Sequence, residues 1–159
     1  MKAVLQRVSK AQVVVEGETV GSIGPGLMIL LGVERGDNER DSTFLAKKSV
    51  EMRIFNDADG KMNLSVKDIG GSALIISQFT LPAEWKKGRR PSFIRAAEPK
   101  EGERLYEHFM EEVRALGIPV EKGVFGAHME VSLTNDGPVT IILDHQFANA
   151  EETAAAIAE

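Results

Sequence analysis

Alternating hydrophobic and polar positions dominate the first part of the chain. Together with the many β-branched residues, this period-two pattern predicts four strands, near residues 2–8, 11–16, 18–23 and 27–34. Glu16-Gly17-Glu18 separates two of them and is typical of a tight turn. The chain therefore begins as an antiparallel, hairpin-rich segment.

Two later segments carry helical signals. Asp37 or Asn38 can cap a helix that extends to about residue 52. Pro99 suits the first turn of a second helix, which ends near Gly117. The apolar residues of this second helix fall on one face: Leu105, Phe109, Val113 and Leu116.

The apolar run Ser72–Phe79 predicts a strand buried on both faces, where a partner subunit could supply one of the covers. A polar, proline-containing loop follows over residues 80–98. Two more strands are expected, near 128–134 and 139–143, joined by a turn at Asn135-Asp136-Gly137-Pro138. This order lacks regular βαβ alternation, so we expect one α+β domain over residues 1–143 and an acidic, Ala-rich tail over 144–159.

Composition narrows the function classes. The 159 residues are 43% hydrophobic and 27% charged, which is typical of a soluble globular domain. The sequence has no cysteine, so disulfides, thiol nucleophiles and cysteine-based metal sites are excluded. Its three histidines lack metal-ligand spacing, so no metal site is predicted. The apolar runs are too short for a membrane span, and we expect a soluble, cytoplasmic protein.

The charge is unevenly distributed. The net charge is −5, and the last sixteen residues hold four acids without any Lys or Arg. Residues 82–95, in contrast, carry five basic groups against one acid. This local excess can hold a phosphate-bearing partner, or it can be a solvated loop.

Simple motif chemistry is sparse. The glycines at 21, 24 and 26 lack the dinucleotide-binding spacing, and DADG at 57–60 is a turn rather than a calcium loop. Ser77 and Thr80 are possible hydroxyl nucleophiles, although no histidine lies nearby in sequence to act as a base. His128 and Glu130 share one face of a predicted strand, either as an acid–base pair or as exposed polar residues.

Two short blocks resemble the signature motifs of a known family. Ser77-Gln78-Phe79-Thr80-Leu81 and Asn135-Asp136-Gly137-Pro138-Val139-Thr140 are similar to the two motifs of the D-aminoacyl-tRNA deacylases, also called D-tyrosyl-tRNA deacylases. The resemblance extends from Met1 to about Leu143. It includes the connecting blocks MKAVLQRVSKA, GLMILLGV, RIFNDADGKMNL and RRPSF.

The resemblance implies a homodimer with a barrel-like mixed sheet, two main helices and active sites at the dimer interface. It implies a hydrolase, without metal or cofactor, that cuts the ester between a D-amino acid and the 3′-terminal adenosine of tRNA. It also implies hydrolysis of glycyl esters mischarged on tRNA-Ala. The expected partner is therefore charged tRNA, and neither DNA nor a membrane.

The resemblance also assigns roles to residues. Catalysis falls to four consecutive residues of the first block, Ser77, Gln78, Phe79 and Thr80. The substrate-binding residues are Leu81, Phe125, Met129 and Arg7. Gly137-Pro138, with a cis bond, would reach into the other subunit and reject L-aminoacyl groups, and Arg7 would fix this turn. Contacts to tRNA phosphates are expected from the basic loop, at Lys86, Lys87, Arg89 and Arg90.

An aminoacyl ester is already activated, so positioning and an oxyanion site can suffice. We expect backbone N–H groups near Phe79 and Thr80 to stabilise the oxyanion, and the ribose 2′-hydroxyl of the substrate to assist. The Thr80 hydroxyl would be a hydrogen-bonding aid or a nucleophile. His128 stands where the family commonly has an acid, so it carries no expected role. The alternatives are a non-catalytic RNA- or nucleotide-binding dimer of the same fold, and a scaffold protein.

Overall fold

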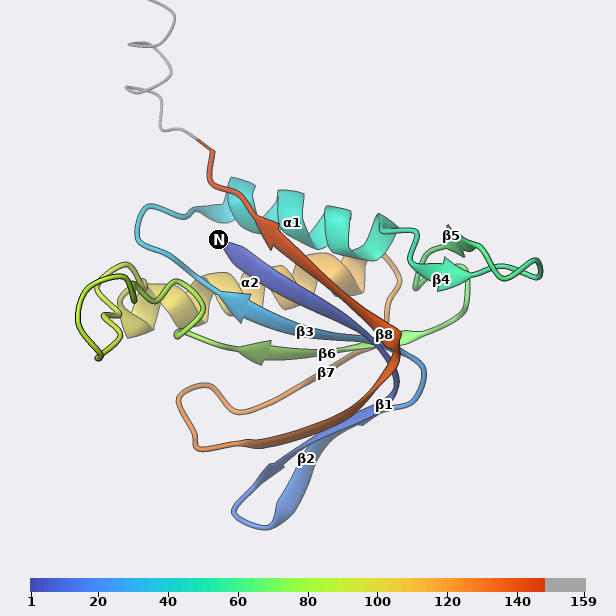
Figure 1. The fold of residues 1–159 in the computed structure, drawn as a ribbon, viewed down its shortest axis with the longest axis horizontal. Helices are drawn as coiled ribbons and strands as arrows, with labels where there is room; N and C mark the ends of the chain where they lie inside the picture. The colour runs from blue at the N-terminus through green and yellow to red at the C-terminus, as the bar shows by residue number, and fades with distance from the viewer. Residues whose placement is uncertain (148–159) are drawn as a thin grey trace, which may run out of the picture.

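The structure, a computed structural model, describes residues 1–147. Its main sheet is mixed and has the strand order β2-β1-β3-β6-β7, with β8 paired to the other edge of β1 (Figure 1). The strands of this sheet are β1 (Lys2–Val15), β2 (Glu18–Ile23), β3 (Gly26–Gly32), β6 (Ser72–Ser77), β7 (Val120–Lys122) and β8 (Glu130–Asp144). A short separate hairpin consists of β4 (Phe55–Asn56) and β5 (Met62–Leu64).

The sheet curls into a nearly closed barrel. β1 pairs with β3 through its first half and with β2 through its second half, and both pairings are antiparallel. β3, β6 and β7 are parallel to one another. β2 approaches β7 so closely that a Cβ at Gly21 would lie 2.7 Å from the carbonyl oxygen of Lys122. A glycine at this position is therefore what allows the two ends of the sheet to meet.

Two helices cover one side of the sheet (Figure 1). They are α1 (Glu39–Glu51) and α2 (Pro99–Ala115), and both begin as predicted. Asn38 caps α1 because its side-chain oxygen accepts from the backbone N–H of Arg40, while Asp41 accepts from the backbone N–H of Asn38. Among residues 1–147, no helix is long and apolar enough to cross a membrane.

β6 is buried on both faces, as its continuous apolar sequence predicts. Ala73 and Ile75 point into the core under the helices, whereas Leu74 and Ile76 point into a second core inside the barrel. The expectation that a partner subunit supplies one cover is wrong for this strand, because the chain's own helices and barrel wall cover both faces.

The prediction of a turn between two strands at residues 135–138 is also wrong. β8 is one continuous strand, paired with β1 on both sides of this segment, at Val8↔Asn135 and at Gln6↔Thr140. Residues 136–139 form a bulge opposite Arg7. The Asn135 side chain closes the bulge, since its Oδ1 accepts from Val139 N at 2.7 Å. Asn, Asp, Gly and Pro here serve a bulge within a strand and not a hairpin.

Smaller differences have local causes. The two strands expected at 2–8 and 11–16 are one strand, β1, with an irregular register near Ser9. β7 was not predicted, since it has only three residues and lies at the sheet edge. The strand expected to start at His128 starts at Glu130. DADG is a turn, as predicted, closed by a hydrogen bond from Gly60 N to Asp57 O. Residues 148–159, most of the predicted tail, lie outside the described residues.

The parallel pairing of β3 with β6 depends on Gly26. A Cβ at this position would lie 1.9 Å from the carbonyl oxygen of Ser72, which is backbone and cannot move aside. We expect Gly26→Ala to lower the free energy of unfolding by about 3 kcal/mol or more, because the strands must separate to relieve this overlap. Urea or thermal unfolding measures the effect.

Gly24 provides the matched control. A Cβ there would meet no atom within 4 Å. Gly24→Ala should therefore leave stability within about 0.5 kcal/mol of the wild type. Equal stability of the two variants would contradict the role assigned to Gly26.

Candidate functional site

A pocket of about 480 Å³ opens where β6 ends. Its walls come from Val33 and from three segments that are distant in sequence. They are the end of β6 with the residues that follow it (76–79), the start of α2 with the residues before it (96–102), and the segment 125–131 that leads into β8. The walls are mostly apolar, as is common in pockets that bind small organic groups.

The end of β6 is fixed from both sides. The backbone N–H of Gln78 donates to Leu31 O at 2.8 Å, which prolongs the pairing with β3. From the helix side, the hydroxyl of Tyr106 donates to Ile75 O at 2.7 Å. Tyr106 is almost completely buried, and this desolvation raises the pKa of its phenol. Tyr106 therefore acts as a neutral hydrogen-bond donor that ties α2 to the strand carrying the site.

The segment after β6 forms a compact turn. The Gln78 side-chain amide donates to the Thr80 hydroxyl oxygen at 2.5 Å, and Leu81 N donates to Gln78 O at 3.3 Å. Gly32 at the end of β3 makes room for this turn, since a Cβ there would lie 2.9 Å from the Cβ of Leu81. The sequence analysis did not identify Gly32 as a site residue, because only its position at the end of an apolar strand distinguishes it in the sequence.

Two backbone donors in this turn are free. Within residues 1–147, neither Phe79 N nor Thr80 N donates a hydrogen bond to a protein acceptor. Adjacent N–H groups without a protein acceptor, at the edge of a pocket, are the kind of donors that stabilise a developing oxyanion.

Two aromatic side chains, Phe79 and Phe125, line the pocket, and Met129 lines it as well. Phe79 is 60% exposed and makes an edge-to-face contact with Phe93, their ring centroids 5.3 Å apart. Sequence reasoning did not single out Phe93, which lies in the RRPSF block and becomes relevant only through its contact with Phe79.

The pocket also includes His128. His128 is exposed and, in the described part of the chain, forms no hydrogen bond with Glu130. The structure therefore offers no support for an acid–base pair of these two residues. Across residues 1–147, no three His, Cys, Asp or Glu side chains gather as a candidate metal site.

Thr80, Leu81, Arg7 and Gly137-Pro138 do not line this pocket. The Gly137-Pro138 peptide is cis, and both residues are exposed. Arg7 is buried beside them. Its Nε donates to Asp136 O at 2.8 Å and its Nη1 to Ile54 O at 2.8 Å. Arg7 thus fixes the bulge of β8, while the bulge lies away from the pocket of its own chain.

The basic loop forms a second hollow, of about 550 Å³. Lys86, Lys87 and Arg90 line it, whereas Arg89 does not. Two reciprocal backbone hydrogen bonds of 2.8 Å between Glu84 and Ser92 close the loop at its base. The loop projects beside the start of α2 (Figure 1).

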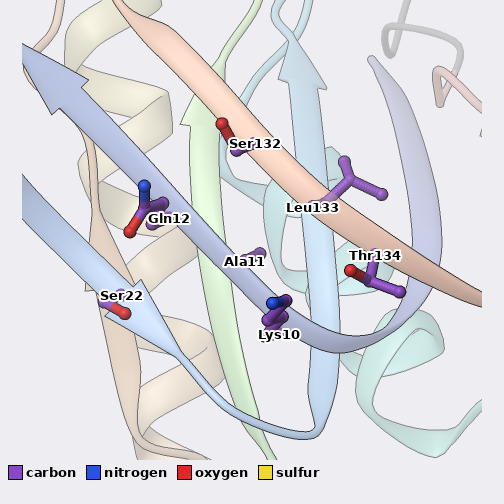
Figure 2. A pocket seen from close by; sticks show the side chains of 7 residues that line it. All are labelled: Lys10, Ala11, Gln12, Ser22, Ser132, Leu133 and Thr134. Atoms are coloured by element: carbon purple, nitrogen blue, oxygen red, sulfur yellow. The ribbon is translucent and has the colours of Figure 1, made fainter.

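A third, shallower hollow of about 260 Å³ lies on the wall of the barrel (Figure 2). Its side chains come from three strands, β1, β2 and β8, and they include Gln12, Ser22 and Ser132. It contains none of the predicted site residues and no titratable group other than Lys10. The 480 Å³ pocket is therefore the candidate site.

Comparisons with known proteins identify the family of this chain. A family model described as D-Tyr-tRNA(Tyr) deacylase matches residues 4–144. The chain is 59% identical over 144 residues to the D-aminoacyl-tRNA deacylase of Pelobacter propionicus. The matched region covers 91% of this chain and 99% of that protein. The chain is 58% identical, over the same length, to the D-aminoacyl-tRNA deacylase of Thermomicrobium roseum, covering 94% of that protein.

Solved structures share the fold. One described as "c-Myc DNA Unwinding Element Binding Protein" has a TM-score of 0.88 and 39% identity, and covers 92% of this chain and 100% of its own. Another, described as a probable eukaryotic D-amino acid tRNA deacylase, has a TM-score of 0.75 and 19% identity and shows the fold alone. With a family model that matches residues 4–144 and relatives that are almost 60% identical, the chain belongs to the D-Tyr-tRNA(Tyr) deacylase family.

Proposed function

We propose that this protein hydrolyses the ester that joins a D-amino acid to the 3′-terminal adenosine of tRNA, in the 480 Å³ pocket. The observation that carries the proposal is the convergence of Ser77, Gln78 and Phe79 with Phe125 and Met129 around that one pocket. The family and the names of its closely similar members support the same reaction.

The pocket suits an adenosine that carries an aminoacyl group. Phe79 and Phe125 offer apolar, aromatic surface on which a base can stack. Phe79 lines the pocket and Thr80 directly follows it. Their N–H groups, which have no protein acceptor among residues 1–147, would donate to the ester oxygen as negative charge develops there.

The chemistry we propose is assisted by the substrate. Water attacks the ester carbonyl carbon, and the bond from this carbon to the ribose 3′-oxygen breaks. The proton lost by the water reaches the 3′-oxygen through the neighbouring 2′-hydroxyl, so the products are a free amino acid and tRNA. The protein contributes position and oxyanion stabilisation, and it needs no metal or cofactor for these steps.

The selection against L-amino acids is assigned to Gly137-Pro138 of a second copy of the chain. In its own chain this pair lies outside the pocket, exposed, and is fixed by the bond from Arg7 to Asp136 O. A homodimer would bring its carbonyls to the pocket of the other subunit, where they would crowd an L side chain. Glycine has no side chain to crowd, so glycyl-tRNA, including glycine mischarged on tRNA-Ala, would also be a substrate.

The basic loop is assigned to the acceptor phosphates of tRNA. Lys86, Lys87 and Arg90 line one hollow, and Arg89 lies in the same loop. In the described residues none of these four side chains takes part in an ion pair, so all are available to phosphate.

Matched D- and L-tyrosyl-tRNA test the reaction. We expect hydrolysis of the D-ester at least about a hundred-fold faster than that of the L-ester, with no effect of EDTA. In Arg7→Met the loss of the bond to Asp136 O should lower this ratio about ten-fold, because the bulge is no longer fixed.

Asn56→Ala is the control for Arg7→Met. It removes another polar neighbour of Arg7, at 3.4 Å, but leaves the bond to Asp136 O. If the wild-type protein hydrolyses the D- and the L-ester equally fast, the assignment of Gly137-Pro138 is contradicted. If a folded protein that binds tRNA hydrolyses neither ester, the non-catalytic RNA-binding alternative is favoured.

Thr80→Val tests whether Thr80 is a nucleophile. The Thr80 hydroxyl accepts a hydrogen bond from the Gln78 amide. If it is only a hydrogen-bonding aid, its removal should lower kcat about two- to ten-fold. Single-turnover assays on D-tyrosyl-tRNA measure this. Complete loss of activity in the folded variant, with an acyl-enzyme trapped on the wild-type protein, would instead assign Thr80 as the nucleophile.

Salt dependence tests the basic loop. We expect log kcat/KM to fall as log salt rises, with a slope that becomes shallower by roughly 0.7 to 0.9 for each phosphate contact removed. Replacing Lys86, Lys87, Arg89 and Arg90 by Gln should therefore flatten the dependence, whereas Lys61→Gln in the β4–β5 hairpin should not. An unchanged slope in the four-fold variant would contradict the assignment.

A further inference from the structure

Trp85 is an aromatic residue that the proposed chemistry leaves unexplained. It is the single tryptophan of the chain and its side chain is 72% exposed. It follows Glu84 directly, and the backbone bonds between Glu84 and Ser92 hold the base of the loop. Gly88, with φ of +67°, provides the turn at the other end. The loop is thus a short closed hairpin that holds a large apolar ring out in solvent.

The surroundings of this ring are cationic. Trp85 lines the 550 Å³ hollow together with Lys86, Lys87, Arg90 and Arg95, against the single carboxylate of Glu84. Of these cations, Arg95 has a carboxylate partner among the described residues, since its guanidinium lies 3.7 Å from Glu34. An exposed aromatic ring among unpaired cations is the arrangement that binds single-stranded nucleic acid, where bases stack on the ring and phosphates contact the cations.

The two hollows belong to one loop. Residues 80–98 leave the 480 Å³ pocket at Phe79 and return to it at Ala96 and Ala97, while the middle of the loop forms the 550 Å³ hollow. Arg35 fixes the returning segment, because its backbone N–H donates to Arg95 O at 2.9 Å and its Nε to Ile94 O at 2.6 Å. The same loop thus contributes residues to both hollows.

We propose that Trp85 stacks on a base of the single-stranded 3′ end of tRNA, next to the terminal adenosine. The Lys86, Lys87 and Arg90 side chains then contact the phosphates of the same nucleotides. This inference rests on the proposed function, since it takes the strand that carries the ester as the ligand. It adds a second nucleotide subsite, read by stacking, to the pocket that holds the ester.

Intrinsic fluorescence tests the inference directly, because Trp85 is the only source of tryptophan signal. The probe is an RNA hairpin that carries no amino acid and ends in a single-stranded 3′ ACCA. It is added to the full chain. We expect saturable quenching by this hairpin. A hairpin with the same stem and a flush end should quench at least about ten-fold more weakly, since it has no unpaired base to stack.

Variants of Trp85 measure how much its ring contributes to the affinity for RNA. Binding of the ACCA hairpin, followed by the anisotropy of a dye at its 5′ end, should weaken about five-fold or more in Trp85→Ala. Trp85→Phe should restore affinity to within about two-fold of the wild type, because a ring is present again. The control is Met62→Ala, another exposed apolar residue, in the β4–β5 hairpin at the opposite end of the molecule (Figure 1). It should bind as the wild type does.

Three results would overturn the inference. The first is equal affinity of Trp85→Ala and the wild type, and the second is equal quenching by the flush-ended hairpin. The third is a Trp85 emission maximum that shifts with protein concentration in the absence of RNA, which would mean that a second copy covers the ring. A separate assay of D-tyrosyl-tRNA hydrolysis keeps the two proposals apart. If hydrolysis persists while these binding tests fail, the role of Trp85 falls alone. If the ring-dependent binding holds without hydrolysis, the subsite stands and the deacylase function falls.

Discussion

Burial of β6 on both faces is the constraint on which the rest of the structure depends. Helices cover one face and the curled half of the sheet covers the other, so the strand cannot shift without disturbing both cores. Gly26 and Gly21 permit the close backbone approaches that this arrangement requires, one beside β6 and the other between β2 and β7. The residues that follow β6 are anchored by this strand, and they form one wall of the pocket.

The site is unusual in how little titratable chemistry it holds. Its polar side chains are those of Ser77, Gln78 and His128, and the rest of its walls are mostly aromatic or aliphatic. Such a site acts by geometry, so its precision depends on the supports behind it. The buried Tyr106 and the bond from Gln78 N to Leu31 O are those supports.

The sequence predicted most of the local structure and part of the site. The period-two pattern located most of the long strands because it reflects burial directly, and capping residues, Pro99 and one apolar helical face located the two helices. The patterns could not show that β8 continues through Asn135–Pro138, since the bulge exists only through its pairing with β1 and the bond from Arg7. Likewise Phe93 and Trp85 gained meaning only from what lies beside them in space. The family assignment, which the comparisons confirm, came from motif resemblance and not from any of these patterns.

Arg7 recognises the β8 bulge through main-chain oxygens, and this has a consequence for how the sequence can vary. The carbonyls of Asp136 and Ile54 are present whatever side chain stands at those positions, so substitutions there leave both bonds possible. A change at residue 7 removes both at once, and few side chains could replace a guanidinium that reaches two carbonyls. As far as these two bonds are concerned, substitutions should therefore be tolerated at Asp136 and Ile54 and restricted at Arg7. We therefore expect no covariation of residue 7 with residue 54 or residue 136 through these bonds.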